Sequence, residues 1–141
     1  MKYVIELLND RSITLEKIAY LVKEIKNDDK NINFYIDSIS NILSIKSIQD
    51  LITLGVIIDI YTENKLLPKE LLTLLNNDSL FELDKLISLS VLNEFGAEAI
   101  INYSIISKSD TLKEILDNKK INKFLDDIIC VIASAASIDL V

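Results

Sequence analysis

The segment NKFLDDIICVIASAAS, residues 122–137, decides the fold class of this chain because it reads as a helix without a polar face. It has two adjacent acids, Asp126 and Asp127, then an apolar run at 128–132, and then alanines and serines at 133–137. A helix that is apolar all round is normally buried on every side, and its small residues let neighbouring backbones come close. The sequence therefore predicts an all-α fold in which this segment is a central helix surrounded by others.

Hydrophobic periodicity divides the rest of the chain into further helices. We expect them at residues 3–8, 15–25, 33–44, 48–64, 69–75, 79–95, 97–106 and 111–116. In the helix at 48–64 we expect the apolar residues to be buried, namely Leu51, Leu54, Ile57, Ile58 and Tyr61. Gly55 lies one turn before Asp59 and removes bulk beside that carboxylate.

Several residues have the chemistry that starts or ends a helix. Thr14 is a good N-cap, and Pro68 suits the first position of a helix because its missing N–H has no helical partner there. Two pairs resemble capping boxes, Ser47 with Asp50 and Ser79 with Glu82. Gly96 suits the left-handed conformation that ends helices.

Length and composition indicate one soluble domain covering residues 1–141, which is long enough to bury a sizeable core. Two glycines and one proline are too few for the frequent turns of a β-sandwich or barrel. The longest apolar stretches, 51–60 and 128–138, are shorter than the roughly 20 residues of a spanning helix, and the N-terminus lacks the features of a signal peptide. A single cysteine, Cys130, excludes a disulfide within one chain, so we expect a cytoplasmic protein.

The net charge of −7 argues against a nucleic-acid partner, because neutralising phosphates needs a basic surface. It also weakens electrostatic adhesion to anionic lipid. Half of the residues are hydrophobic, and on short helices this favours a homo-oligomer.

The residues that are absent limit the chemistry that this chain can perform. It has no histidine, which excludes the commonest general base and every histidine-based zinc site. Cys130 lies in an apolar run, where a thiol is inert, and glycines at only 55 and 96 allow no glycine-rich phosphate loop. What remains is carboxylate chemistry, which suits Mg²⁺ or Mn²⁺.

Four aspartates interrupt otherwise apolar helical patterns, and these are the candidate metal ligands: Asp59, Asp84, Asp126 and Asp127. Asp126 and Asp127 point about 100° apart on a helix, so one could bind metal while the other positions water or meets a neighbouring helix. Structural alternatives stay open. The pair at 126–127 could simply oppose the positive end of the helix dipole, and Asp59 could form a salt bridge with a lysine.

The chain resembles the phosphatidylglycerophosphatase A family, in its short soluble branch called YutG-like. The matching stretches are ITLEKIAYLV, LGVIIDIYTENKLLP, ELDKLISLSVLNEFG, INYSII and KFLDDIICVIASAAS, which follow in the family's order from about residue 13 to 137. The resemblance implies an all-α fold with a central helix. It also implies a Mg²⁺-dependent phosphatase that removes phosphate from phosphatidylglycerophosphate in glycerophospholipid synthesis.

Carried over residue by residue, the family's Asp-Asp pair falls on Asp126 and Asp127, and Asp59 matches an aspartate of the soluble branch. The family's Asp-Glu pair falls on Asp84 and Lys85, so a cation replaces the glutamate. The family's segment with an aspartate a few residues before Lys-Pro falls on 107–111, which reads SKSDT and lacks that arrangement, since no Lys-Pro follows. These differences keep a second interpretation open, a catalytically degenerate member that acts as a binding or structural helical protein.

The first interpretation gives each residue a role. Asp84, Asp126 and Asp127, with Asp59 as a further ligand, would hold Mg²⁺ or Mn²⁺. Asp126 and Asp127 would be catalytic, one of them orienting the attacking water. Lys123 and Lys85 would contact the phosphate of a phosphorylated lipid head group or a small phosphate ester. A lipid substrate would require transient membrane contact.

Overall fold

The computed structural model describes residues 1–75, 83–116, 120 and 123–138, and these residues confirm the all-α prediction, since they contain no strand. The helices in order are α1 Lys2–Asp10, α2 Leu15–Lys26, α3 Asn33–Leu43, α4 Lys46–Glu63, α5 Lys69–Leu75, α6 Leu83–Leu92, the 3₁₀ helix η1 Asn93–Phe95, α7 Ala97–Ile106, α8 Asp110–Ile115 and α9 Lys123–Ile138.

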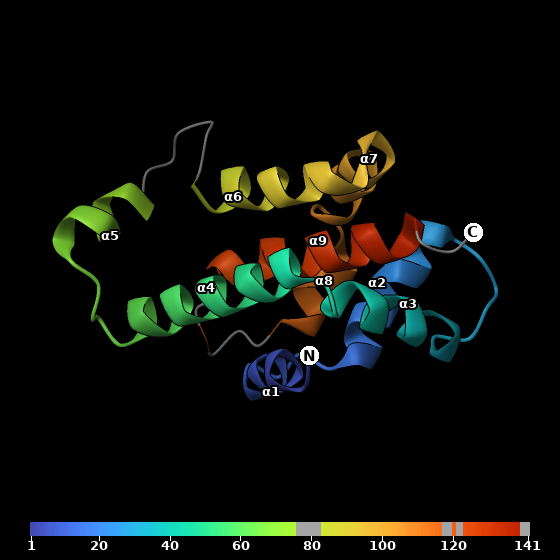
Figure 1. Cartoon of the computed structure of the whole chain (residues 1–141), viewed down its shortest axis with the longest axis horizontal. Coiled ribbons are helices and arrows are strands. Elements are labelled where there is room, and N and C mark those ends of the chain that lie inside the picture. The colour runs from blue at the N-terminus through green and yellow to red at the C-terminus, as the bar shows by residue number, and fades with distance from the viewer. Residues whose placement is uncertain (76–82, 117–119, 121–122, 139–141) are drawn as a thin grey trace.

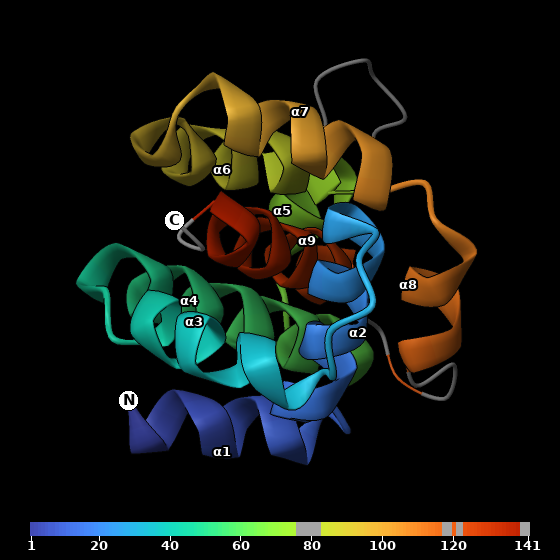
Figure 2. The ribbon, with the colours of Figure 1, turned by 90° about the vertical axis from the view of Figure 1, so that its right-hand side faces the viewer.

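The helix α9 is the centre of the array, as its composition predicts. It packs against α2, α3, α4, α6 and α7, and both views show it enclosed by these helices (Figures 1 and 2). Every residue from 127 to 137 is buried. In Figure 1, α4 and α6 run along opposite sides of α9, which brings residues far apart in sequence to its first turns.

Several predicted helix ends are confirmed. The side chain of Thr14 caps α2 by accepting a hydrogen bond from the amide of Lys17 at 3.2 Å. The helix α7 has the expected bounds. Gly96 has a φ of +92°, which favours glycine, but its ψ of −179° differs from the left-handed helical conformation predicted, and the α-helix before it already ends at Leu92. The confirmed positions were predictable because each depends on local backbone chemistry.

The capping box predicted at Ser47 and Asp50 is wrong. The helix α4 begins earlier, at Lys46, and its N-cap Ile45 offers no side-chain hydrogen bond. Ser47 instead donates to Glu94 at 3.0 Å, and Asp50 pairs with Lys46 at 2.9 Å. Each of these two side chains therefore has a partner other than the backbone amides at the start of α4.

Pro68 stands one position earlier than predicted. It precedes α5, and its carbonyl accepts the amide of Leu72 at 3.0 Å, so it occupies the N-cap position instead of the first helical one. The second predicted capping box, Ser79 with Glu82, lies outside the described residues.

The helix α4 buries less of its apolar surface than predicted. Leu51 is buried and Ile58 half-buried, but three of the five expected core residues are exposed, namely Leu54, Ile57 and Tyr61. The reason is that α4 lies on the outside of the array and turns only one face toward α9. In the described part of the chain no single helix is long and apolar enough to cross a membrane, although α3 and α4, which meet at an angle of 89°, reach that length together.

Gly55 marks the closest approach of α4 to α9. A Cβ atom at this position would collide with the side chain of Ile128 and would lie 3.2 Å from the Cβ of Phe124. The missing side chain therefore lets α4 lie directly against the first turns of α9, where the candidate aspartates are.

Candidate metal centre

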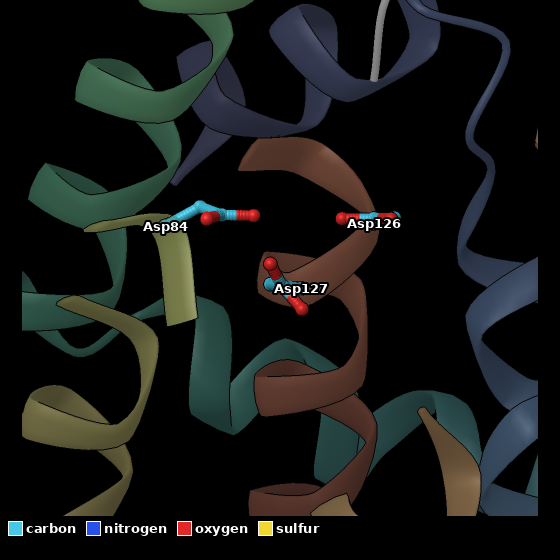
Figure 3. Close-up of side chains that lie close together, drawn as sticks. All are labelled: Asp84, Asp126 and Asp127. Carbon is cyan, nitrogen blue, oxygen red and sulfur yellow. The ribbon is translucent and has the colours of Figure 1, made fainter. Parts of the chain in front are cut away.

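Three of the four predicted aspartates come together between two helices. Asp84 lies in the first turn of α6, and Asp126 and Asp127 lie near the start of α9. Each offers a carboxylate oxygen, and these three oxygens lie within 4.8 Å of one another. Figure 3 shows Asp84 pointing from α6 toward the turns of α9 that carry the other two. Although the side chains of Asp126 and Asp127 leave the helix about 100° apart, each brings a carboxylate oxygen into the same cluster.

Two of the three aspartates are buried and Asp126 is half-buried, and each has an oxygen without a hydrogen-bond partner. Asp84 is 3 % exposed and Asp127 is 5 % exposed. Each of the three residues has a buried oxygen without a hydrogen-bond partner: Oδ1 of Asp84, Oδ1 of Asp126 and Oδ2 of Asp127. Unpaired buried carboxylates are unstable unless a cation or bound protons neutralise them. The arrangement therefore fits a metal ion, and an all-oxygen ligand set suits Mg²⁺ or Mn²⁺.

The pKa values of two of these aspartates are raised by their burial and by the neighbouring carboxylates. Burial raises the pKa of Asp126 from 3.8 to about 7, and the negative charge of Asp84 adds to the rise. Burial also raises the pKa of Asp127 well above its usual range, with further increases from Asp84 and Asp126. A divalent cation would favour the charged form of these groups and reverse both shifts.

Tyr103 of α7 is a component of the site that sequence reasoning missed. Its hydroxyl donates a hydrogen bond to Oδ1 of Asp127 at 2.8 Å, and both side chains are buried. The available signal was the tyrosine inside the apolar helix INYSII, since a buried phenol needs an acceptor. Nothing in the sequence indicates which acceptor it meets.

Asp59 is buried beside the cluster but has a different role. Its Oδ1 and Oδ2 accept hydrogen bonds from the backbone amides of Phe124 and Leu125 at 3.0 and 2.9 Å. These amides are in the first turn of α9, so Asp59 provides from α4 the capping that a helix usually receives from its own N-cap. Asp59 is not a member of the three-residue cluster, and we therefore leave it out of the ligand set.

The helix-dipole alternative for Asp126 and Asp127 has lost its main support. The helix does begin at Lys123, which places Asp126 in the first turn. However, two backbone amides at this end of the helix already donate hydrogen bonds to the carboxylate of Asp59. Capping therefore does not explain why Asp126 and Asp127 both lie in the cluster with Asp84.

The two candidate phosphate contacts lie next to the cluster in sequence. Lys85 follows Asp84 and is exposed, and Lys123 begins α9 with a half-buried side chain. The positive charge of Lys85 lowers the pKa of Asp126, but less than burial raises it. Cys130 is buried, and burial raises the pKa of its thiol, as expected for an inert cysteine.

A separate surface pocket of about 540 Å³ lies between α2 and α8. Its walls mix charges, with Lys23 and Glu24 from α2 and Glu114 from α8. None of the clustered aspartates lines it, so we do not connect this pocket with the metal centre.

Comparison with known proteins identifies relatives along almost the whole chain. The chain is 30% identical to the uncharacterized protein YutG of Bacillus subtilis over 138 residues, which cover 92% of this chain and 83% of that protein. It is 29% identical to the uncharacterized protein YpjQ of the same organism over 139 residues, which cover 94% and 78%. No family model matches the chain.

Solved structures confirm the fold. The crystal structure of Bacillus subtilis YpjQ matches with a TM-score of 0.85 at 26% identity, covering 96% of this chain and 89% of that one. A protein of unknown function from Bacillus stearothermophilus matches with a TM-score of 0.84 at 29% identity and the same coverage. These names state no activity, so the comparisons show family and fold only.

Proposed function

The chain belongs to the family of the Bacillus subtilis proteins YutG and YpjQ, and we propose that it is a Mg²⁺- or Mn²⁺-dependent phosphatase acting on a phosphate monoester. The observation that carries this proposal is the group of three carboxylates, two buried and one half-buried. They offer oxygens within 4.8 Å of one another, and each keeps an oxygen without a hydrogen-bond partner. A structural role would leave such groups paired, as Asp59 is.

We assign each side chain of the site a separate role in hydrolysis. Asp84, Asp126 and Asp127 would hold the ion, which when bound supplies positive charge for a phosphate oxygen and lowers the pKa of a bound water. Asp126 is the least buried of the three, so we assign to it the orientation of the attacking water. Lys123 and Lys85 would attract the phosphate dianion.

The substrate class comes from the resemblance to phosphatidylglycerophosphatase A. The segments KFLDDIICVIASAAS and ELDKLISLSVLNEFG, which carry that resemblance, contain all three aspartates of the cluster. Phosphatidylglycerophosphate or a related phosphate ester is therefore the substrate that we propose, in a cytoplasmic protein with transient membrane contact.

The degenerate alternative stays a second candidate. In it, the ammonium group of Lys85 could take the place of the metal. The positive charge of Lys85 lowers the pKa of Asp126, but less than burial raises it, so we favour a metal ion as the partner of the cluster.

The decisive experiment measures phosphate release from short-chain phosphatidylglycerophosphate, with and without Mg²⁺, for the wild-type protein and for Asp127→Asn. We expect metal-dependent release that this variant loses. Asp50→Asn is the matched control, because Asp50 is an exposed helical aspartate paired with Lys46, and it should keep full activity.

No release with Mg²⁺ or Mn²⁺ from folded protein would reject a phosphatase acting on this substrate. Calorimetric titration with Mn²⁺ would then separate the remaining possibilities. Saturable binding that Asp127→Asn abolishes would keep the metal centre and redirect the search to soluble phosphate esters. Absent binding would favour the degenerate member.

A further inference from the structure

A hydrogen bond from α7 fixes the orientation of one carboxylate in the cluster. Tyr103 is 7 % exposed, and its hydroxyl donates to Oδ1 of Asp127 at 2.8 Å. The helices α7 and α9 pack directly against each other, side by side in both views (Figures 1 and 2). The hydrogen bond therefore joins two packed helices, and burial keeps both the Tyr103 hydroxyl and the Asp127 carboxylate away from solvent.

The hydrogen bond uses one oxygen of Asp127 and leaves the other for the cluster. Oδ2 of Asp127 has no hydrogen-bond partner. A carboxylate that rotated freely about its last torsion would present either oxygen to a metal. With Oδ1 held on the α7 side, Oδ2 is the oxygen that remains for the ion.

Resting on the proposed metal centre, we propose that Tyr103 is its positioning residue, a neutral donor that sets the orientation of Asp127 for metal binding. Hydrogen-bonded partners of metal ligands commonly have this role, and their loss typically lowers metal affinity about 10- to 100-fold. The phenol suits the role because a tyrosine hydroxyl, with an ordinary pKa of about 10, stays protonated at neutral pH and remains a donor.

The chain contains a matched control for this proposal. Tyr35 of α3 is also fully buried, and its hydroxyl donates to an aspartate, Asp28 in the turn after α2. Asp28 is not part of the cluster. Removing either hydroxyl takes one oxygen from a buried ring and one hydrogen bond from an aspartate. The bond to Asp28 is part-buried whereas the bond to Asp127 is buried, so the structural effect of each variant is measured separately by urea unfolding.

The test compares Tyr103→Phe with Tyr35→Phe by titrating each protein with Mn²⁺ and following the electron paramagnetic resonance signal of the free ion. We expect Tyr103→Phe to bind Mn²⁺ about 10- to 100-fold more weakly and Tyr35→Phe to bind like wild type. In the phosphatase assay, saturating Mn²⁺ should restore most of the turnover of Tyr103→Phe, because the ligands themselves are unchanged.

Three outcomes would overturn the proposal. Wild-type affinity in Tyr103→Phe would show that Asp127 needs no positioning, while the metal centre itself would stand. An equal loss in Tyr35→Phe would assign the effect to general destabilisation. Absence of Mn²⁺ binding in the wild-type protein would remove both the positioning role and the proposed function.

Discussion

Asp59 and the cluster of Asp84, Asp126 and Asp127 lie at the same end of α9, and they differ in what their carboxylate oxygens contact. Asp59 is 1 % exposed, and each of its oxygens accepts a backbone amide. Asp84, Asp126 and Asp127 are crowded together, and each keeps an oxygen without a hydrogen-bond partner. From the sequence all four looked alike, as acids in apolar helices.

The comparison teaches that burial of an acid is weak evidence for a metal site, and that unsatisfied oxygens are better evidence. Two backbone hydrogen bonds lower the pKa of Asp59 and offset part of the rise that burial causes, and the positive end of the helix also favours its charged form. In the cluster, burial is the largest cause of the raised pKa values of Asp126 and Asp127, and the neighbouring carboxylates add to it, so these groups require protons or a cation. If this distinction is right, the same substitution should have opposite effects in the two groups.

The largest effect should come from removing a ligand of the cluster. Asp84→Asn should lower Mg²⁺-dependent turnover by more than the about 10- to 100-fold typical of outer-shell partners, because it withdraws a charged ligand while keeping the shape of the side chain. Steady-state phosphate release measures this. Turnover within threefold of wild type would remove Asp84 from the centre.

Without metal, the stability of the protein should fall as pH rises. Asp59 and Asp126 have pKa values of about 6 and about 7 in the folded protein against 3.8 when unperturbed. The folded state therefore binds more protons than the unfolded chain between about pH 4 and 7, and their contribution to stability is lost across that range.

We expect this loss to be on the order of a few kcal/mol between pH 5 and pH 8. Urea unfolding in the presence of a chelator measures it. Saturating Mn²⁺ at pH 8 should restore stability. Asp127→Asn should reduce both the loss of stability with rising pH and its recovery with Mn²⁺. A stability that rises steadily up to pH 8 without metal would contradict the raised pKa values on which this prediction depends.

The sharpest test of the comparison is the pair Asp59→Asn and Asp84→Asn at pH 8 without metal. Asp59→Asn should destabilise the protein by about 1–3 kcal/mol, because one buried amide of α9 loses its acceptor. Asp84→Asn should leave stability unchanged or raise it, since it relieves repulsion. Chemical denaturation of both variants measures the difference. Equal destabilisation would contradict the proposed difference between Asp59 and the cluster.

The smallest effect is expected at Gly55, which lets α4 approach α9 closely enough for Asp59 to reach its amides. Gly55→Ala should crowd Ile128 and Phe124, costing about 1–3 kcal/mol against about 1 kcal/mol gained in helix propensity. A net loss of roughly 1 kcal/mol should appear in thermal unfolding. Adding Ile128→Val should recover part of it, whereas no recovery would place the strain elsewhere.

Local chemistry determined much of the fold in advance. The apolar segment at 128–132 is buried whatever its neighbours are, because no face of it suits water. Thr14 starts α2 through its own side chain, and Gly96 ends η1 with a positive φ that glycine adopts readily. Where an end depends on distant partners, prediction failed, as at Ser47, which contacts Glu94.

By itself, the sequence determined that α9 is central and that the candidate chemistry is carboxylate chemistry, because it contains no histidine and only one cysteine, which is buried. Only the tertiary structure decided which acids act together. Asp84 meets Asp126 and Asp127 because α6 packs on α9. Asp59 is drawn to the helix amides, and Tyr103 is brought to Asp127 from α7. Such pairings depend on how helices cross, and helix periodicity carries no information about crossing.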